Sequence, residues 1–443
     1  MVTTNHSLKV SLLAACLLSY PTIGHGKPVE LFREIAPIDS PEILSRNLSL
    51  EKNLNSLYRS AGNHVSLNLT PWANRSWKMN AGLIAARYSD PGFVTAGSWR
   101  GRYSYIRNNS VKEILSETRG KKRAKMMDRL SAAEKYDLLV GDPAGSLTRA
   151  QWAAGERYVS NGTIANWMGI CEGTAAAGAL YPEPRHSVDF TTNDGDVLTF
   201  HVMDIKGLAG LLWSSYNADI PISGSRCSSK HPKTDSNGVV ISASCFNSNP
   251  ATFHIALLNF LGLQRRPFFM NRVTSVEVWN VPVLEYKVRY YNPMSSNMTD
   301  NLEDAILPIS RYKRDPFANY RSPQAVSIVG VLADIRIAKG TTTSRDNTSD
   351  SSQANLSYRY DLELDSSGNI VGGEWHQKSH PDFLWAVDEG FRPLSTGDTI
   401  IGPDVRWDGG PIPANWLGPI QKSSNRNQPL EKIVTKLIEL SRQ

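Results

Sequence analysis

The fold and function of this chain are best approached from residues 166 to 180, which read Asn166-Trp167-Met168-Gly169-Ile170-Cys171-Glu172-Gly173-Thr174-Ala175-Ala176-Ala177-Gly178-Ala179-Leu180. A helical run of small residues follows one cysteine, which places Cys171 at a helix N-terminus. Free N–H groups and the positive end of the helix dipole favour a thiolate there, and the thiolate is the nucleophilic form. Gly169 and Gly173 permit a tight turn and close approach of a substrate backbone. The alternative is a buried structural cysteine.

Residues 1 to 26 have the pattern of an export signal. Lys9 supplies a positive charge, residues 10 to 20 are almost wholly apolar, and residues 24 to 26 offer small residues for cleavage. No later stretch reaches the roughly 18 apolar residues that a membrane-spanning helix needs. We therefore expect a secreted protein, extracellular or periplasmic, that does not span a membrane.

The cysteines support a reactive role for Cys171. The chain has four, and Cys16 would leave with the export signal. Cys227 and Cys245 flank a polar, turn-rich loop and are well placed to form a disulfide, which an exported protein can keep. Cys171 is then the odd thiol, and an unpaired cysteine in a secreted protein suggests reactivity.

Composition and element order define the broad class. With 443 residues, 40% of them hydrophobic, the chain can bury a substantial core. The net charge of +6 comes without long basic blocks, so nucleic acid is not expected as a partner, whereas association with a cell wall or an anionic surface stays open. Helical patterns precede a strand-rich final third, which predicts an α+β fold with an antiparallel sheet. The expected regions are a signal peptide (1–26), an N-terminal arm or pro-segment (27–84), a catalytic domain (85–390) and a C-terminal extension packing on the core (391–443).

A cysteine nucleophile needs a base and a group that orients the base. His254 stands in the apolar run 252–262, where an unexplained imidazole is costly. The run is either a helix introduced by Pro250 or a short buried strand. Asn271 ends the next apolar run. A histidine on one strand and Asn or Asp on the next is typical of papain-like and transglutaminase-like sites, in the order Cys171, His254, Asn271.

Two alternatives to this assignment stay open. His254 can be a core histidine whose hydrogen bonds are satisfied internally. His380 is a second candidate for the base, with Asp382 as its partner.

Several blocks together resemble the transglutaminase elicitor family, known from cell-wall transglutaminases of oomycetes. The resemblance spans about residues 85 to 390. Val278-Trp279-Asn280-Val281-Pro282-Val283, followed by Lys287-Val288, is similar to the surface peptide by which plants recognise those enzymes. The other blocks are Tyr136 to Asp142, Trp167 to Cys171, Asn249 to His254, Tyr360 to Leu364, Gly372 to Trp375 and His380 to Trp385.

The resemblance implies a secreted protein–glutamine γ-glutamyltransferase with a papain-like cysteine site. Cys171 matches the nucleophile position and His254 the base, while Asn271 stands where an aspartate is expected. Glu172 is a second departure, because the family tends to follow its cysteine with His-Gly-Trp. A carboxylate that faces the Cys171 thiolate would raise the pKa of the thiol by like-charge repulsion. Calcium is a possible cofactor by this resemblance. The turn from Asp189 to Asp196, with three aspartates, is interpreted as part of a hairpin, with a calcium site as the alternative.

The mechanism that follows is acyl transfer between proteins. Cys171 attacks a glutamine side-chain amide, His254 protonates the departing ammonia, and a lysine amine resolves the thioester. The Cys171 N–H and a side chain hold the oxyanion, for which the candidates are Trp167, Asn166 and Gln151. The alternatives are a cysteine protease or deamidase that uses the same Cys-His-Asn site, and a surface-recognition protein whose site is degenerate.

Overall fold

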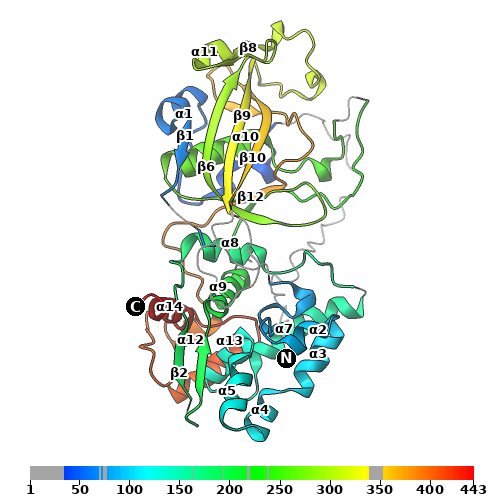
Figure 1. Ribbon diagram of the computed structural model, residues 1–443. Coiled ribbons are helices and arrows are strands. Elements are labelled where there is room, and N and C mark those ends of the chain that lie inside the picture. Colours follow the sequence, from blue (N-terminus) through cyan, green and yellow to red (C-terminus); the bar gives the residue numbers. More distant parts are fainter. Residues whose placement is uncertain are drawn as a thin grey trace, which may run out of the picture.

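The chain forms a sheet-rich half and a helical half, joined at a waist where α8 lies (Figure 1). The computed structural model describes residues 34–68, 71–72, 77–161, 163–192, 194–216, 220–236, 239–338 and 353–443. The predicted export signal, residues 1 to 26, lies outside the described residues. Buried apolar residues form one cluster in each half. The two halves therefore have separate cores, and the buried alanines of α8 at the waist belong to the core of the helical half.

The sheet half contains antiparallel pairs throughout its described strands. The main sheet has the order β11-β10-β9-β6-β5-β12-β4, with β1 and β7 pairing with β6, and β8 with β9. A separate hairpin, β2 with β3, belongs to the helical half. The strands are β1 (His64–Ser66), β2 (Val188–Thr191), β3 (Val197–Phe200), β4 (Ile222–Gly224), β5 (Phe269–Asn271), β6 (Asn280–Tyr291), β7 (Met298–Thr299), β8 (Ile306–Pro308), β9 (Ser327–Ala338), β10 (Gln353–Leu364), β11 (Ile370–Gly372) and β12 (Phe383–Trp385).

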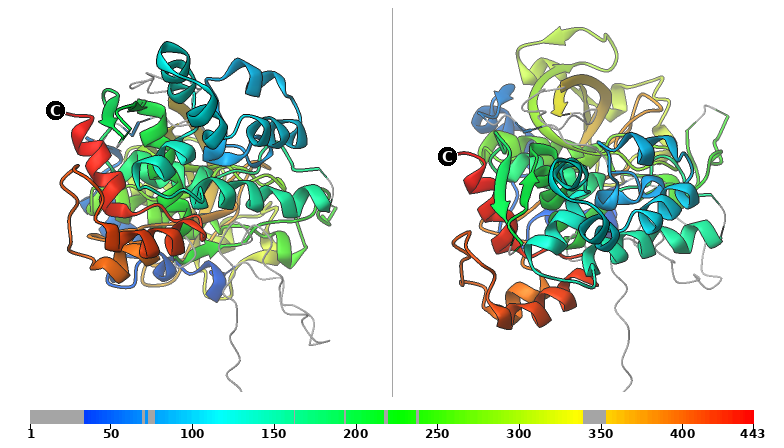
Figure 2. Two further views of the ribbon diagram at one scale, coloured as in Figure 1. Left: turned by 90° about the horizontal axis from the view of Figure 1, so that it is seen from below. Right: turned by 60° about the horizontal axis from the view of Figure 1, so that its bottom comes forward.

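The long strands β6, β9 and β10 curl around α10, as Figure 2 shows from two further directions. Phe253 and Ile255 of α10 are fully buried among strand residues such as Val331 and Leu362. Burying an aromatic or branched side chain contributes roughly 1.5–3 kcal/mol, so the helix forms the centre of this core.

The apolar run around His254 is a helix because its first residues form a cap. The Asn249 side chain accepts a hydrogen bond from the Ala251 N–H, and Pro250 occupies the first helical position, where its missing N–H costs nothing. α10 continues as the π-helical segment η8 (Leu257–Leu263). The alternative that placed this run on a buried strand is therefore wrong.

Helices make up most of the other half, with α9 at its centre. Nearly every residue from Val202 to Ser214 is buried. The C-terminal helix α14 packs on α9, so residues 391–443 complete this core. The α-helices are α1 (Leu54–Ala61), α2 (Pro91–Thr95), α3 (Trp99–Asn108), α4 (Val111–Glu117), α5 (Gly120–Asp128), α6 (Ala132–Leu139), α7 (Ser146–Ser160), α8 (Cys171–Leu180), α9 (Val202–Tyr216), α10 (Pro250–Ala256), α11 (Leu302–Ala305), α12 (Thr396–Ile401), α13 (Leu417–Ser424) and α14 (Glu431–Leu440).

Residues 27 to 84, predicted as an arm or pro-segment, contribute to both cores where they are described. Leu54 and Leu57 are buried in the sheet core, whereas Leu83 and Ile84 are buried in the helical core. This segment is an integral part of the packing.

Gly173 lets α8 and α9 lie unusually close together. A Cβ atom at this position would lie only 2.1 Å from the Gly210 carbonyl oxygen and 2.4 Å from the Ser214 nitrogen, both in α9. At Gly173 the close approach is therefore made by the backbone of α9, and approach of a substrate backbone to this turn stays a prediction. The contact fixes α8, and with it Cys171, relative to the helical core.

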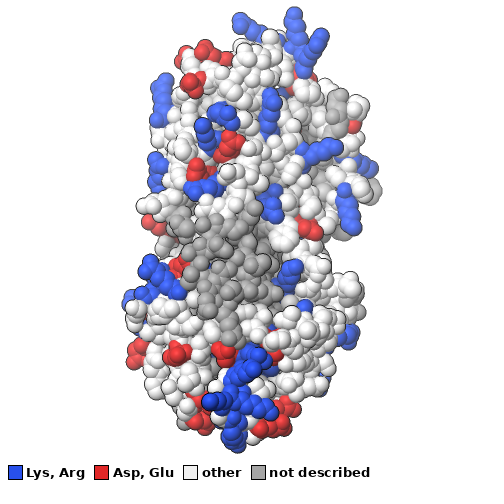
Figure 3. All heavy atoms as spheres, in the orientation of Figure 1, with Lys and Arg blue, Asp and Glu red and all other residues white. Residues whose placement is uncertain are grey.

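The basic residues of α4 and α5 lie at the far end of the helical half, where Figure 3 shows lysine and arginine gathered. Only Met127 of α5 is buried. Arg123 pairs with Asp196 at 2.9 Å, and Arg119 donates to carbonyl oxygens at the end of α4. Part of this charge therefore serves local structure.

Candidate active site

Cys171 is the first residue of α8, as the sequence predicts, and it is half-buried with a free thiol. The turn before it is tied to the helical half, because the Met79 N–H donates to the Met168 carbonyl at 2.8 Å and Lys78 forms a bridge with Gly169. Ile170, fully buried, anchors the chain just before the helix. The thiol is thus held at a helix N-terminus by packing on both sides.

The predicted disulfide is confirmed, with Cys227 and Cys245 bonded to each other. Cys171 is accordingly the described cysteine that is not part of a disulfide. This free state is the one that a nucleophilic role requires.

Three groups surround the Cys171 sulfur. The Val278 carbonyl oxygen lies 3.6 Å from Sγ, the Asn280 side-chain Nδ2 lies 3.8 Å away, and Glu172 Oε2 lies 3.7 Å away. Asn280 is the first residue of β6 and Val278 lies just ahead of it, so the sheet half supplies one side of the site and α8 supplies the other. These are long contacts of the kind that sulfur makes.

The Asn280 amide is oriented by a tryptophan. Trp385 Nε1 donates to Asn280 Oδ1 at 2.8 Å, and an indole nitrogen can only donate. The carbonyl of the amide therefore faces Trp385, which leaves the NH₂ group facing the sulfur. The Trp385 ring is itself fixed by stacking on Phe269, with ring centres 4.1 Å apart. The result is a pre-oriented hydrogen-bond donor beside the Cys171 sulfur.

Glu172 turns its carboxyl toward the thiol. Its Oε2 faces Cys171, and its Oε1 accepts a hydrogen bond from the Ser214 hydroxyl of α9 at 2.6 Å. Burial raises the pKa of Glu172, an effect that the hydrogen bonds from Ser214 and Cys171 only partly oppose. This carboxyl consequently binds a proton more readily than an exposed glutamate does.

Asn271 holds the β6 end of the site in place. It is fully buried, and its Oδ1 accepts a hydrogen bond from the Trp279 N–H at 2.8 Å. Its Nδ2 donates to Asp382 Oδ2 and to the Val273 carbonyl, both at 3.1 Å. Trp279 lies between Val278 and Asn280, the two residues of this segment that contact the sulfur. Asn271 therefore helps to fix their position without touching the cysteine.

His254 lies in the core of the sheet half. Its Nδ1 is 2.8 Å from the Tyr360 hydroxyl and its Nε2 is 3.2 Å from the Tyr290 hydroxyl. The ring is fully buried, and burial lowers the pKa of His254 to about 3. The structure therefore does not join Cys171, His254 and Asn271 by hydrogen bonds. Both imidazole nitrogens are engaged by tyrosines, which matches the core-histidine alternative.

Substituting His254 with glutamine tests its role through pH. A buried histidine with a pKa near 3 stays neutral, whereas an unfolded histidine titrates near 6.5. Its stabilising contribution is complete above pH 6.5 and is lost as the pH falls toward 3, by roughly 1.4 kcal/mol for each pH unit. Glutamine can bond the same tyrosines without titrating. We expect urea unfolding at several pH values to show a weaker acid sensitivity in His254→Gln.

In the same variant we expect iodoacetamide to label Cys171 at the parent rate. A fall of about 100-fold in that rate, with the fold intact, would restore His254 as the base.

The second candidate base, His380, stacks on Trp375 with ring centres 4.8 Å apart, and its Nδ1 lies 3.1 Å from the Pro381 carbonyl. Asp382, its predicted partner, bonds Asn271 instead. Burial raises the pKa of Asp382 to about 8, although the charge of Arg226 and the bond from Asn271 oppose the effect. Asp382 belongs to the support of the β6 segment.

The side chains predicted for the oxyanion site are held elsewhere. Gln151 is fully buried and donates to Asn427, and Asn166 accepts a hydrogen bond from Asn80. The Trp167 ring lies under the Arg226 guanidinium. Sequence reasoning missed Asn280 for this role, although it stood in one of the blocks that carry the family resemblance.

These observations can be set beside known proteins. A family model described as transglutaminase elicitor matches residues 45–402. The chain belongs to the transglutaminase elicitor family. No curated protein matches it. The crystal structure of the GP42 transglutaminase from Phytophthora sojae is similar, with a TM-score of 0.53 and 20% identity over 88% of this chain and 98% of that one. At this identity the likeness shows a common fold, mixed helix and curled antiparallel sheet.

The contacts of Asn271, where the resemblance implies an aspartate, favour an amide. An aspartate there would place a second carboxyl group against Asp382, whose pKa burial already raises to about 8, so at least one of the two carboxyl groups would have to stay protonated. An amide can donate to Asp382 and accept from Trp279 at once. Asparagine therefore suits the contacts of this member of the family.

The described residues contain no group of three or more histidine, cysteine, aspartate or glutamate side chains placed to hold a metal ion. Within the same residues, each helix is too short or too polar to cross a membrane.

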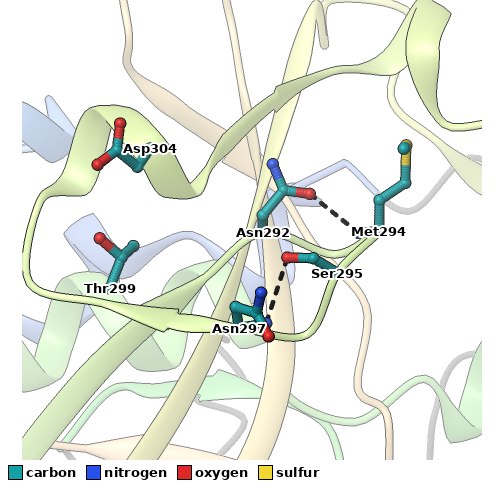
Figure 4. A pocket seen from close by; sticks show the side chains of 6 residues that line it. All are labelled: Asn292, Met294, Ser295, Asn297, Thr299 and Asp304. Atoms are coloured by element: carbon teal, nitrogen blue, oxygen red, sulfur yellow. Dashed lines mark hydrogen bonds between the residues drawn. The ribbon is translucent and has the colours of Figure 1, made fainter.

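A pocket of about 420 Å³ lies near the far end of β6 from Asn280, and residues with polar side chains, together with Met294, line it (Figure 4). Asn292 and Ser295 accept hydrogen bonds from backbone N–H groups of the same loop. The pocket contains neither a thiol nor a histidine, so the candidate site remains at Cys171. Its lining residues are Asn292, Met294, Ser295, Asn297, Thr299 and Asp304.

Proposed function

We propose that this protein is a secreted protein–glutamine γ-glutamyltransferase whose nucleophile is Cys171. The observation that carries the proposal is a free, half-exposed thiol at the start of α8, facing the oriented Asn280 amide donor. Acyl transfer needs a nucleophile that attacks the carbonyl carbon and a hydrogen-bond donor that stabilises the negative charge on the carbonyl oxygen. Membership of the transglutaminase elicitor family supports the same reaction class.

The reaction would proceed through a thioester. The thiolate attacks the side-chain carboxamide carbon of a protein-bound glutamine, and the oxyanion that forms accepts hydrogen bonds from Asn280 Nδ2 and the Cys171 N–H. The C–N bond breaks and ammonia leaves with a proton. A lysine amine then attacks the thioester carbon, the C–S bond breaks, and a new amide joins the two proteins.

Asn271 would act as a positioning residue in this scheme, because it holds Trp279, which lies between the two sulfur contacts Val278 and Asn280. The contacts of His254 with Tyr290 and Tyr360 favour a role in the sheet core, so its assignment as the base stays a prediction that the glutamine substitution tests. The papain-like description likewise stays a proposal about the arrangement of the site.

Hydrolysis is the second candidate, and the partial exposure of Cys171 favours it, because water that reaches the thioester would replace the amine. A cysteine protease or deamidase would then use the same thiol. A degenerate site that serves only in recognition is the third candidate, and it predicts a thiol with no catalytic activity.

One assay separates these functions. The purified protein is offered a glutamine-containing peptide with and without a primary amine, and mass spectrometry follows the peptide. We expect amine incorporation with loss of ammonia. Conversion of glutamine to glutamate even at saturating amine would identify a deamidase, cleavage of the backbone a protease, and an unchanged peptide a recognition protein.

A further inference from the structure

The carboxyl group of Glu172 lies beside the Cys171 sulfur. Its Oε2 lies 3.7 Å from Cys171 Sγ, and both residues lie in the first turn of α8. The predicted base, His254, is bonded to two tyrosines and to neither Cys171 nor Asn271. The site therefore contains a proton acceptor that the expected Cys-His-Asn arrangement does not use.

We propose that Glu172 accepts the proton of the Cys171 thiol and returns it to the departing ammonia. The inference rests on the acyl-transfer function proposed above and names the acid–base residue of that site. The thiol proton passes to Glu172 Oε2 as the sulfur attacks the amide carbon. When the C–N bond breaks, the same proton passes from the carboxyl to the nitrogen.

The second half-reaction uses the carboxylate again. The attacking lysine amine loses a proton to Glu172 as its nitrogen bonds the thioester carbon. The C–S bond then breaks, and the proton returns from Glu172 to the sulfur. Summed over both steps, a glutamine amide and an amine give a new amide and ammonia, with no other reactant.

Packing between α8 and α9 holds the carboxyl in the required orientation. Ser214 donates to Oε1 at 2.6 Å, which leaves Oε2 for the sulfur. Gly173 brings the α9 backbone close enough for this bond, since a Cβ there would meet the Ser214 nitrogen at 2.4 Å. Glu172 is thus oriented by two neighbouring residues that take no part in the chemistry.

The surroundings of Glu172 favour proton exchange with a thiol. Burial raises its pKa, which narrows the gap to that of a cysteine and makes the transfer less uphill. Charged groups on the adjacent elements are engaged elsewhere. In α9, Asp204 pairs with Lys135, and Lys206 pairs with Glu183. Ahead of β6, the Glu277 carboxyl accepts a hydrogen bond from the Trp279 indole. Arg226, which lies over the Trp167 ring, donates to the Val276 carbonyl.

The test compares Glu172→Gln with the parent by two measurements, amine incorporation and the pH profile of Cys171 alkylation by iodoacetamide. We expect incorporation to fall by about 10²- to 10⁴-fold, because the proton acceptor is lost. We expect alkylation not to slow, because removing a neighbouring negative charge lowers the thiol pKa. The parent profile should show two coupled ionisations, and the variant should show one.

Three controls separate this role from structural damage. Glu277→Gln makes the same change at an exposed glutamate near the site and should leave both measurements at parent values. Glu172→Asp keeps a carboxyl group and should recover part of the lost incorporation. Ser214→Ala releases Oε1 but keeps the base, so we expect a smaller loss than in Glu172→Gln.

The proposal is overturned if Glu172→Gln incorporates amine within tenfold of the parent, or if its alkylation slows in step with incorporation. If the parent itself transfers nothing, the proposed function fails, and the alkylation profiles still decide this inference. Identical profiles in parent and Glu172→Gln would then show that the carboxyl does not exchange a proton with the thiol.

Discussion

Replacing Cys171 with alanine is expected to lower amine incorporation by about 10⁴- to 10⁶-fold, because no covalent intermediate can form without the nucleophile. The half-exposed side chain lies at the first position of α8, so we expect the unfolding free energy to change by less than about 1 kcal/mol. Incorporation of a fluorescent amine into a glutamine-containing protein measures the first effect, and urea unfolding measures the second.

Cys171→Ser is the matched control, since it keeps the size of the side chain and replaces a strong nucleophile with a weak one. We expect it to be almost as inactive as the alanine variant. In the parent, iodoacetamide should label the peptide that contains Cys171 and spare Cys227 and Cys245, which form the disulfide. Substantial incorporation by Cys171→Ala would remove Cys171 as the nucleophile.

Replacing Asn280 with alanine is expected to lower kcat by about 10²- to 10³-fold, the usual effect of losing one donor to an oxyanion. The NH₂ group of this amide faces the sulfur from the β6 side of the site. It would therefore stabilise the negative oxygen that forms when the sulfur attacks. Initial rates at several concentrations of a glutamine peptide separate kcat from KM.

Trp385→Phe provides a matched control for the orientation of that amide. It removes the indole N–H that fixes Asn280 and keeps an aromatic ring to stack on Phe269. We expect a fall in kcat smaller than that of Asn280→Ala. A rise in KM with unchanged kcat in Asn280→Ala would instead show that this amide binds the ground state, contrary to the oxyanion role.

Local sequence signals predicted the features that depend on few residues. The small-residue run after Cys171 indicated a helix that begins at the cysteine, and the structure confirms it. Cysteine counting predicted the Cys227–Cys245 disulfide, which is also confirmed. The family blocks predicted the family that the matched model shows. Each of these inferences needs only neighbouring residues or a count, so no knowledge of the tertiary structure is required.

The assignment of His254 as the base depended on contacts that the local sequence does not show. An apolar run of this length is compatible with a helix or a strand, although Pro250 at a first helical position favours the helix. In the structure the cap by Asn249 starts a helix, and the partners of His254 are Tyr290 and Tyr360, 36 and 106 positions away in sequence. Nothing in the sequence near His254 indicates that these two hydroxyl groups surround its ring.

The sequence by itself thus determined the nucleophile candidate, the disulfide, the α+β class and the family. Only the tertiary structure decided which groups surround the thiol, because they come from separate elements. β6 brings Asn280 to the sulfur and β12 orients it, while α9 turns the Glu172 carboxyl through Ser214. Hydrogen bonds between distant segments depend on how the two cores pack together, and no local pattern of residues encodes that packing.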